Sequence, residues 1–356
     1  MVASAAAPLS VASLSTKGKI DRLTKLFRGR RRRALVMTHD NPDPDSMAAA
    51  WALATVLSER VGVPADLAYG GIIGRAENAA FVKTLKLPIR HVEEVDFGEY
   101  DLFALVDTQQ TVGNHALPGD LLADIVIDHH PVRDDAVATP FADLGGSYGA
   151  TSTMLTEYLR AARLDPGPEL STALYYGIKA DTRDLGRQTK DPDVECYLWL
   201  FPRIDRELLS HIEHPELPVR YFRLYHAAIE KARLYTEAVI TDLGDVYTPD
   251  MVAEVAERLS FIEGPKWSLA YGSYRSQLYL SLRVSDKRMN AGRLIRETCA
   301  PLGGSAGGHG SMAGARLPLA GKKSQREEFK RDVVRRFKEA FGVDGERGVS
   351  LLSDEA

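Results

Sequence analysis

The stretch ALVMTHDNPDPDSM, residues 34–47, constrains the fold more than any other part of the chain. Its apolar start predicts a short buried strand over Ala34 to Met37. Pro42 and Pro44 then exclude regular structure, because proline lacks a backbone donor and fixes φ. A helix is expected to follow, with Asp45 or Ser46 as its N-cap. The stretch thus sets polar side chains on a rigid loop at the carboxyl end of a strand, where open α/β sheets bind ligands. These side chains are His39, Asp40, Asp43 and Asp45.

An apolar run that ends in a polar residue occurs three more times. A predicted strand over Leu102–Val106 leads to Asp107, and another over Ala123–Ile127 leads to Asp128, His129 and His130. An apolar helix ends near Asp181. Strands that alternate with helices predict an α/β fold with a mostly parallel sheet and helices on both faces. The polar residues are therefore expected to gather along one edge of that sheet.

The pattern changes near residue 236, where a second, smaller α/β domain is predicted. TEAVITDLGDV, WSLAYGSYRSQ and LYLSLRVS have the composition of strands, and two amphipathic helices lie among and after them. GGSAGGHGSMAG is interpreted as a glycine-rich loop that leads into a helix of small residues. The predicted divisions are a disordered leader at 1–18, a first domain at 19–205, a helical linker at 206–235, a second domain at 236–343 and a loose tail at 344–356.

Composition excludes several classes of protein. The formal net charge of −4 gives no global basic field for duplex nucleic acid. Cys196 and Cys299 are far apart in the sequence, which excludes a disulfide scaffold and a cysteine-based zinc site and fits a reducing cytoplasm. No apolar run reaches the length of a membrane span, and no signal peptide is evident. A cytoplasmic protein without a membrane partner is therefore expected.

The polar residues at the predicted strand ends have the chemistry of a metal site. Carboxylates with two or three imidazoles and no thiolate suit Mn²⁺ or Mg²⁺, and less often Zn²⁺ or Co²⁺. There are enough of them for two ions with one bridging carboxylate, an arrangement that serves phosphoryl hydrolysis. Each fragment alone has a simpler interpretation: Asp107 as a helix cap, His129 and His130 as packed rings, and Asp181 as a partner of Arg183 or Arg187.

The motifs HDNPDPDS, VDTQ, DHHP and IKADTRD, in this order, resemble those of the DHH phosphoesterase superfamily. GGSAGGHGSMAG resembles the GGGHxxAAG motif of the associated DHHA1 domain, although a third consecutive glycine is missing and Ser305-Ala306 intervenes. The resemblance covers roughly residues 30–320 and implies two α/β domains with the active site in the cleft between them.

The resemblance also implies roles for individual residues. His39, Asp43 and Asp107 would hold one ion. Asp45, Asp107, His129 and Asp181 would hold the other, so that Asp107 bridges. His130 would serve as a phosphate ligand or proton donor, and Asp128 would orient a ligand imidazole. In the second domain, Gly307, Gly308 and His309 would approach the substrate, and Arg283 would bind its terminal phosphate, with Arg275 as the competing candidate.

Length favours the small two-domain members of the superfamily, which act on short substrates. The expected function is Mn²⁺-dependent hydrolysis of short RNA, of dinucleotides such as pApA and of 3′-phosphoadenosine 5′-phosphate, with Mg²⁺ or Co²⁺ as alternative ions. A cyclic-dinucleotide phosphodiesterase and an inorganic pyrophosphatase or exopolyphosphatase are the enzyme alternatives. A nucleotide-binding sensor is the alternative from another class. The sequence leaves a homodimer open.

Overall fold

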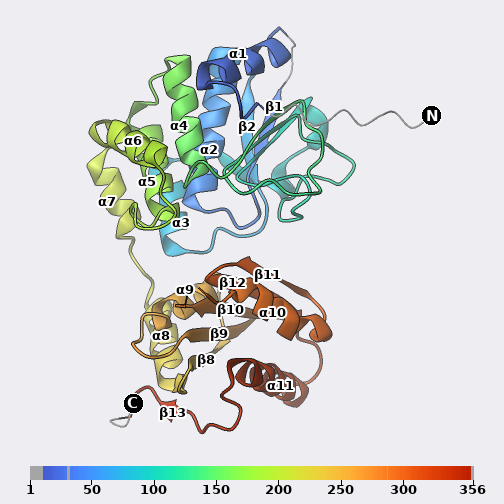
Figure 1. Cartoon of the computed structure of the whole chain (residues 1–356), viewed down its shortest axis with the longest axis vertical. Helices are drawn as coiled ribbons and strands as arrows, with labels where there is room; N and C mark the ends of the chain where they lie inside the picture. The colour runs from blue at the N-terminus through green and yellow to red at the C-terminus, as the bar shows by residue number, and fades with distance from the viewer. Residues whose placement is uncertain (1–10, 30–32, 287, 354–356) are drawn as a thin grey trace, which may run out of the picture. The chain divides into compact units, whose positions relative to one another are not determined.

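The structure is a computed structural model that describes residues 11–29, 33–286 and 288–353, apart from the side chain of His309. The chain forms two compact units, Met1–Pro215 and Glu216–Ala356 (Figure 1). Each unit has a sheet and a hydrophobic core of its own. The α/β class with two domains, predicted from the sequence, is confirmed.

The first unit is built on a parallel sheet of six strands in the order β3-β2-β1-β4-β5-β6. From β1 the chain continues to β2 on one side, and from β4 it continues to β5 on the other. β1 and β4 are therefore the neighbours at which the strand order reverses, and ligands bind beyond the carboxyl ends of strands at such a point. The strands are β1 (Ala34–Met37), β2 (Ala65–Tyr69), β3 (Ile89–His91), β4 (Leu102–Val106), β5 (Ile125–Asp128) and β6 (Phe141–Leu144).

Alternate residues of the strands enter two different cores. Val36 and Ala104 face the larger core, to which the α-helices of this unit contribute. Leu35 and Leu105 face a smaller core that is completed by short 3-10 turns and by residues of the segment 108–124. The α-helices of this unit thus pack on one face, and the second face is covered by the 3-10 helices Val92–Glu94 and Phe97–Glu99 and by a segment that contains Gly113, Pro118 and Gly119. The helices are α1 (Thr16–Phe27), α2 (Pro44–Thr55), α3 (Ala76–Leu85), α4 (Thr151–Ala162), α5 (Gly167–Asp181), α6 (Asp191–Leu200) and α7 (Arg206–Glu213).

A buried ion pair fastens α1 to the sheet. Lys19 Nζ donates to both carboxylate oxygens of Asp143 on β6, at 2.9 and 2.8 Å. The Tyr158 hydroxyl from α4 donates to Asp143 Oδ2 at 2.7 Å. All three side chains are buried, so the carboxylate is neutralised and hydrogen-bonded by the chain itself.

The second unit contains a mixed sheet of seven strands in the order β11-β12-β10-β9-β8-β7-β13. β8 and β9 are parallel, and the other pairs are antiparallel. Its strands are β7 (Arg233–Leu234), β8 (Ala238–Asp245), β9 (Trp267–Tyr274), β10 (Gln277–Val284), β11 (Ser305–His309), β12 (Met312–Pro318) and β13 (Val349–Ser350). Its helices are α8 (Val219–Lys231), α9 (Asp250–Leu259), α10 (Ala291–Cys299) and α11 (Lys323–Phe341).

Two local expectations are wrong in this unit. The glycine-rich segment forms a β-hairpin of β11 and β12, not a loop followed by a helix, with Gly310 and Ser311 at the turn. The tail expected to be loose, 344–356, contains a strand, because Val349–Ser350 pairs with β7. The expected linker, 206–235, contains α7 of the first unit and α8 of the second. Of the expected leader 1–18, residues 1–10 lie outside the described part, and α1 begins at Thr16.

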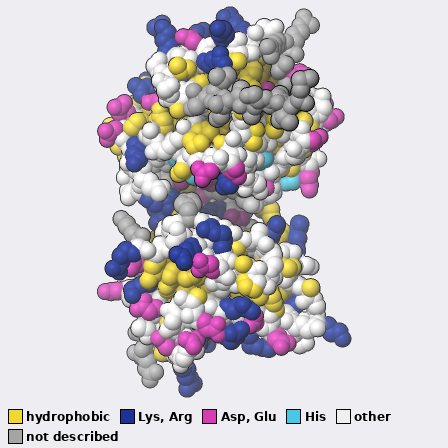
Figure 2. All heavy atoms as spheres, turned by 45° about the vertical axis from the view of Figure 1, so that its right-hand side comes forward, with side chains coloured by type: hydrophobic (Ala, Val, Ile, Leu, Met, Phe, Trp, Pro, Cys, Tyr) yellow, Lys and Arg dark blue, Asp and Glu magenta, His cyan; other side chains and the backbone are white. Residues whose placement is uncertain are grey.

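In the described part of the chain, no helix combines the length and the apolar character that a membrane span requires. Lys and Arg side chains are interspersed with Asp and Glu side chains on the face of each unit drawn in Figure 2. This mixture agrees with the small net charge of the sequence.

Candidate metal centre

The helix after β1 begins earlier than the sequence predicted, so the polar residues of this segment lie at its start. Asp43, not Asp45 or Ser46, is the N-cap of α2, and its Oδ1 accepts a hydrogen bond from Ser46 N at 2.9 Å. Asp45 lies in the first turn of α2 and is buried. His39 comes directly from the loop after β1, and its Nε2 lies 3.7 Å from Asp43 Oδ1. Pro44 occupies the first helical position, where a missing donor is tolerated.

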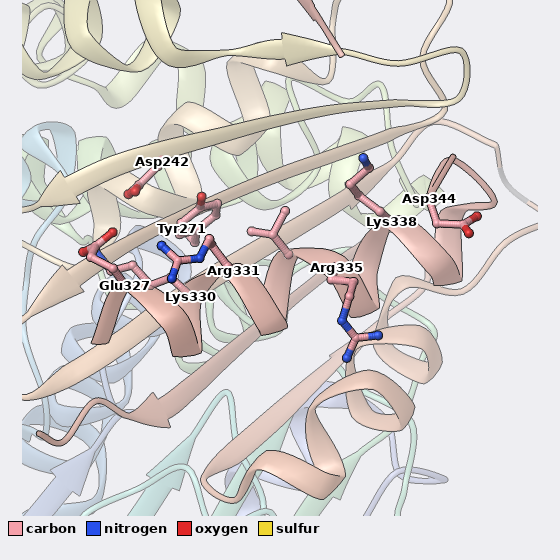
Figure 3. Close-up of a pocket in the computed structure, with 9 residues that line it drawn as sticks. Asp242, Tyr271, Glu327, Lys330, Arg331, Arg335, Lys338 and Asp344 are labelled. Atoms are coloured by element: carbon pink, nitrogen blue, oxygen red, sulfur yellow. The ribbon is translucent and has the colours of Figure 1, made fainter. Parts of the chain in front are cut away.

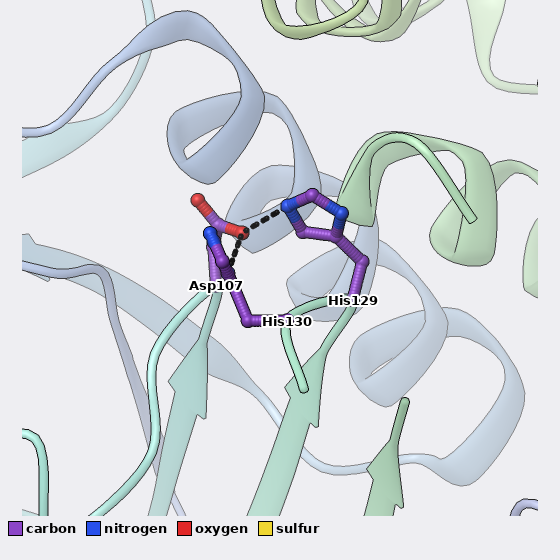
Figure 4. Close-up of side chains that lie close together, drawn as sticks. All are labelled: Asp107, His129 and His130. Carbon is purple, nitrogen blue, oxygen red and sulfur yellow. Dashed lines mark ion pairs between the residues drawn. The ribbon is translucent and has the colours of Figure 1, made fainter. Parts of the chain in front are cut away.

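Asp107 lies between two sets of side chains. It follows β4 in a left-handed conformation, with φ of 60°. Its Oδ2 is 3.6 Å from His39 Nε2. Its Oδ1 is 3.6 Å from His129 Nε2 and 3.7 Å from His130 Nδ1, as the dashed lines of Figure 4 show. The two oxygens of one carboxylate thus face different imidazoles.

A second set joins the ends of β5 and α5 to the first turn of α2. His129 Nε2 lies 3.3 Å from Asp181 Oδ2. Ligand atoms of Asp45, His129 and Asp181 all lie within 4.8 Å of one another, as do those of His39, Asp43 and Asp107. Asp181 Oδ1 is also 3.5 Å from an Arg187 nitrogen, so one oxygen of Asp181 faces the arginine and the other faces the imidazole.

Asp128 contacts the ring of His130, not that of His129. Asp128 Oδ1 lies 2.8 Å from His130 Nδ1, and Asp128 Oδ2 accepts a hydrogen bond from Gln109 at 2.7 Å. The ring of His129 is instead 3.3 Å from the Tyr148 carbonyl oxygen. The imidazole that Asp128 contacts is therefore that of His130, the proposed phosphate ligand, although the two rings lie with their centroids 4.2 Å apart.

The cluster concentrates negative charge in a buried space. Burial and the charges of Asp45 and Asp43 raise the pKa of Asp181 to about 7. The same causes raise the pKa of Asp107 well above its usual range. Burial acts to lower the pKa of His39, but the hydrogen bond and charge of Asp43 outweigh it and raise this pKa to about 10. Carboxylates that repel one another and hold protons are sites where a cation would replace those protons.

The donor set fits divalent metal ions. His129 Nε2 is buried and has no hydrogen-bond partner, although it points among carboxylates. Such an orphaned nitrogen is explained by a ligand that the protein itself does not supply. Carboxylate oxygens with imidazoles suit Mn²⁺ and Mg²⁺. Asp107 belongs to the group with His39 and Asp43 and also to a third group with His129 and His130, whose ligand atoms likewise lie within 4.8 Å of one another. Asp40 lies outside these groups, and its Oδ1 is buried without a hydrogen-bond partner.

Sequence reasoning missed the residues that support the cluster. Thr151 and Ser152 at the start of α4 donate backbone hydrogen bonds to Asp45, and the Thr151 hydroxyl donates to Asp107. Gly177 lets α5 approach α2 and α4, because a Cβ there would lie 2.4 Å from Ser152 Oγ and 3.2 Å from Asp45 Cα. Asp181 lies one turn further along α5. The sequence offers no signal for Thr151 and Ser152, because threonine and serine are common at the start of a helix.

The predicted substrate residues of the second unit lie around β10 and the glycine hairpin. Arg283 pairs across β10 and β12 with Met312, which pairs with His309 on β11. Two residues along, Ser281, Gly314 and Gly307 form the equivalent row, on the same face of the sheet. Arg283 is 9% exposed, and its Nη1 donates to Ser281 Oγ at 2.8 Å.

The competing arginine lies elsewhere. Arg275 is in the turn between β9 and β10, at the opposite end of β10 from Arg283. Its guanidinium lies over the Tyr274 ring, 5.3 Å from the centroid. Gly307 and Gly308 are on β11, and a Cβ on Gly307 would meet no atom within 4 Å.

A separate cavity of about 260 Å³ lies between α11 and the strands β8 and β9 (Figure 3). Several of its charged residues are paired within α11, such as Lys330 with Glu327 and Arg335 with Asp332. Among the described residues, none of the predicted site residues lines it. The residues that do are Asp242, Tyr271, Glu327, Lys330, Arg331, Val334, Arg335, Lys338 and Asp344.

Known proteins resemble this chain in sequence and in fold. The uncharacterized protein MJ1633 of Methanocaldococcus jannaschii is 33% identical over 320 residues, which are 88% of this chain and 65% of that relative. The chain thus spans less than two thirds of the relative's length. An exopolyphosphatase-related protein from Bacteroides fragilis has a TM-score of 0.70 at 15% identity, covering 93% of this chain and 99% of that one. RecJ from Thermus thermophilus, in complex with Mn²⁺, has a TM-score of 0.53 at 15% identity, covering 94% and 56%.

Family matches agree with the motif order. Residues 33–178 match the N-terminal domain of the DHH family and include the described cluster up to His130. Residues 235–339 match the DHHA1 domain and include Arg283 and the glycine hairpin. The chain belongs to the DHH phosphoesterase superfamily, as a member that joins a DHH domain to a DHHA1 domain.

Proposed function

We propose that this protein is a divalent-metal-dependent hydrolase of short oligoribonucleotides and dinucleotides. The observation that carries the proposal is the position of Asp107. Its Oδ2 faces His39 and its Oδ1 faces His129, so it lies between oxygen and nitrogen ligands on two sides of the cluster. A carboxylate between two such groups has the geometry of a bridge between two ions. Mn²⁺ is the proposed ion, and Mg²⁺ and Co²⁺ are the alternatives.

The proposed ligand assignment is supported by short distances. His39, Asp43 and Asp107 would hold one ion. Asp45, His129 and Asp181 would hold the second together with Asp107, whose Oδ1 lies 3.6 Å from His129 Nε2. Two ions held in this way would acidify a water molecule and neutralise the charge on the reacting phosphate. The negative charge of the carboxylates would offset the mutual repulsion of the two ions.

His130 is the proposed proton donor or phosphate ligand. Burial acts to lower its pKa, but the hydrogen bond from its ring to Asp128 outweighs burial and raises it. Because Nδ1 is engaged with Asp128, Nε2 is the nitrogen that can donate. In hydrolysis, the oxygen of water forms a bond to phosphorus, the bond to the leaving oxygen breaks, and His130 would give a proton to that oxygen or hold a phosphate oxygen.

Substrate recognition is assigned to the second unit. Gly307 and Gly314 pair across the hairpin and leave this one row of its face without side chains, which allows a ligand to approach the backbone there. Arg283 shares that face and carries a guanidinium that suits a terminal phosphate. A phosphate anchor at a fixed position favours substrates of one or two nucleotides over long ones.

Hydrolysis assays with purified protein test the proposal. pApA, a longer RNA, 3′-phosphoadenosine 5′-phosphate, a cyclic dinucleotide, pyrophosphate and polyphosphate would each be incubated with Mn²⁺ and with EDTA. Mn²⁺-dependent release of mononucleotide from pApA is expected. Preference for pyrophosphate or polyphosphate would reassign the substrate. Nucleotide binding without metal-dependent product from any of them would favour the sensor.

Two arginine variants separate the candidates for the phosphate anchor. Arg283→Ala is expected to raise KM for pApA by about tenfold and to lower kcat less, if the arginine binds ground state and transition state alike. Arg275→Ala is the matched control, since it removes an arginine from the other end of β10. A KM that rises in Arg275→Ala and not in Arg283→Ala would reverse the assignment.

A further inference from the structure

The first residue of α4, Thr151, contacts three residues of the metal cluster at once. It is fully buried and follows the N-cap Ala150. Its backbone N donates to Asp45 Oδ2 at 2.8 Å. Its Oγ1 donates to Asp107 Oδ1 at 2.7 Å and accepts a hydrogen bond from His129 N at 3.3 Å.

The two parts of Thr151 have different tasks. Ala150 offers no side-chain cap, and the amides of Thr151 and Ser152 are satisfied by the two oxygens of Asp45 instead, at 2.8 and 2.7 Å. Asp45 therefore caps α4 from outside the helix. The hydroxyl of Thr151 takes no part in this cap. Its single proton is donated to Asp107, and one of its lone pairs accepts the hydrogen bond from the backbone of His129.

The hydroxyl determines which way the Asp107 carboxylate is turned. Its hydrogen bond occupies one lone pair of Oδ1 and leaves the other free beside His129 and His130. Oδ2 is then directed toward His39. Without this bond the carboxylate could rotate about its Cβ–Cγ bond.

We propose that Thr151 is a positioning residue that holds Asp107 in the orientation required to bridge two metal ions. The inference rests on the proposed metal-dependent function and adds a residue outside the ligand set. Hydrogen-bond partners of metal ligands typically contribute 10- to 100-fold to metal affinity. A threonine is suited to the task because it is short, and because its Oγ1 both donates and accepts.

Three variants isolate the hydroxyl. Thr151→Val removes it and keeps the shape of the side chain and the backbone amide that binds Asp45. Thr151→Ser restores it. Thr156→Val is the matched control, because Thr156 is also fully buried on α4 and its hydroxyl donates only to Ser152 O of the same helix, at 2.7 Å, among the contacts described.

The measured quantity is the affinity of metal-stripped protein for Mn²⁺. It is determined by calorimetry and from the electron paramagnetic resonance signal of free Mn²⁺. Thr151→Val is expected to bind the more weakly held ion about 10- to 100-fold less tightly. The Mn²⁺ affinities of Thr151→Ser and Thr156→Val are expected to stay within about threefold of the wild-type affinity, because neither change removes the hydrogen bond to Asp107. Wild-type affinity for both ions in Thr151→Val, or equal weakening in Thr156→Val, would overturn the proposal.

Two further measurements keep the outcomes distinct. Thermal unfolding of each metal-free variant reports whether the fold is retained, and Thr151→Ala replaces the valine variant if the latter does not fold. A wild-type protein that binds no Mn²⁺ would refute both the function and this inference. A wild-type protein that binds two ions and hydrolyses no substrate would refute only the function.

Discussion

The negative charge of carboxylates is compensated in different ways at two places in the first unit, around Asp143 and in the metal cluster. Asp143 on β6 accepts hydrogen bonds from Lys19 and Tyr158, so the chain supplies its counter-charge. Asp45, Asp107 and Asp181 are surrounded by imidazoles, a hydroxyl and backbone amides, with Arg187 3.5 Å from Asp181. The first arrangement is complete without a ligand. The second leaves a buried imidazole nitrogen without a partner and carboxylates that hold protons. One group therefore stabilises the fold, and the other is suited to bind cations.

Removal of the bridging carboxylate should have the largest effect. Asp107→Ala is expected to lower metal-dependent turnover by about 10³-fold or more, since each tenfold loss corresponds to about 1.4 kcal/mol and the bridge is worth several kcal/mol. Asp107→Asn, which tolerates the same backbone conformation, tests the charge alone. Steady-state rates with Mn²⁺ measure both. A near-normal rate in Asp107→Ala would show that the cluster around Asp107 does not bind the ions that catalyse the reaction.

Removal of Lys19 should act on the fold and not on the metal. Lys19→Ala leaves Asp143 buried without its counter-ion, which typically costs about 3–5 kcal/mol of unfolding free energy. Chemical denaturation measures this loss. Mn²⁺ affinity of the folded protein is expected to stay within about twofold. The double variant Lys19→Met, Asp143→Leu should recover much of the stability, as buried pairs replaced by apolar residues often do.

Gly177→Ala should affect both the stability of the fold and Mn²⁺ binding to a moderate degree. The added Cβ would press on Ser152 Oγ and Asp45 Cα, and overpacking of this kind costs about 1–3 kcal/mol. The shift would also move Asp181 away from His129, so Mn²⁺ should bind more weakly. Thermal unfolding and Mn²⁺ titration measure the two effects. Gly146→Ala is the control, because a Cβ there would meet no atom within 4 Å.

The dependence of stability on pH should be the smallest effect. The pKa of Asp181 is raised to about 7 and that of His39 to about 10, so the folded, metal-free protein holds these protons more tightly than the unfolded chain. The stabilisation from Asp181 is complete below about pH 4 and lost as pH rises through 7. That from His39 is complete below about pH 6.5 and lost as pH rises through 10.

The metal-free protein should therefore unfold at a lower temperature at pH 9 than at pH 6, by about 5 °C. Saturating Mn²⁺ should narrow this difference, because bound ions replace the protons. Melting curves in EDTA and in Mn²⁺ at the two pH values provide the comparison. An equal or higher melting temperature at pH 9 in EDTA would show that the folded, metal-free protein does not depend on protons bound by Asp181 and His39 for its stability.

Much of the first unit followed from apolar runs and from the residues that end them. β1 and β4 have the predicted bounds, and the polar residues after β1, β4 and β5 meet at one edge because parallel strands share a direction. Chemistry-bearing side chains at strand ends are visible in a sequence. Thr151 is not, because a threonine at the start of an apolar helix is common and its contact with Asp107 is 44 residues distant.

Local prediction failed where small residues carry no pattern. The hairpin SAGGH and MAGARLP contains few side chains that could reveal alternation, and positive φ values at Gly308 and Gly310 permit its course. The partner of Asp128 was also hidden, because adjacent histidines offer no sequence signal for which ring turns toward a neighbour. Capping by Asp43 was missed because the helix begins at a proline within the acidic stretch.

The backbone of Asp107 has a consequence for how this protein could change through mutation. Its φ of 60° is a conformation that, among residues with a side chain, aspartate and asparagine tolerate best. A single-base change converts an aspartate codon to an asparagine codon. That change would silence hydrolysis while keeping the backbone course and the rest of the cluster. Asparagine at this position is therefore the substitution to seek in a relative that has become a nucleotide-binding sensor.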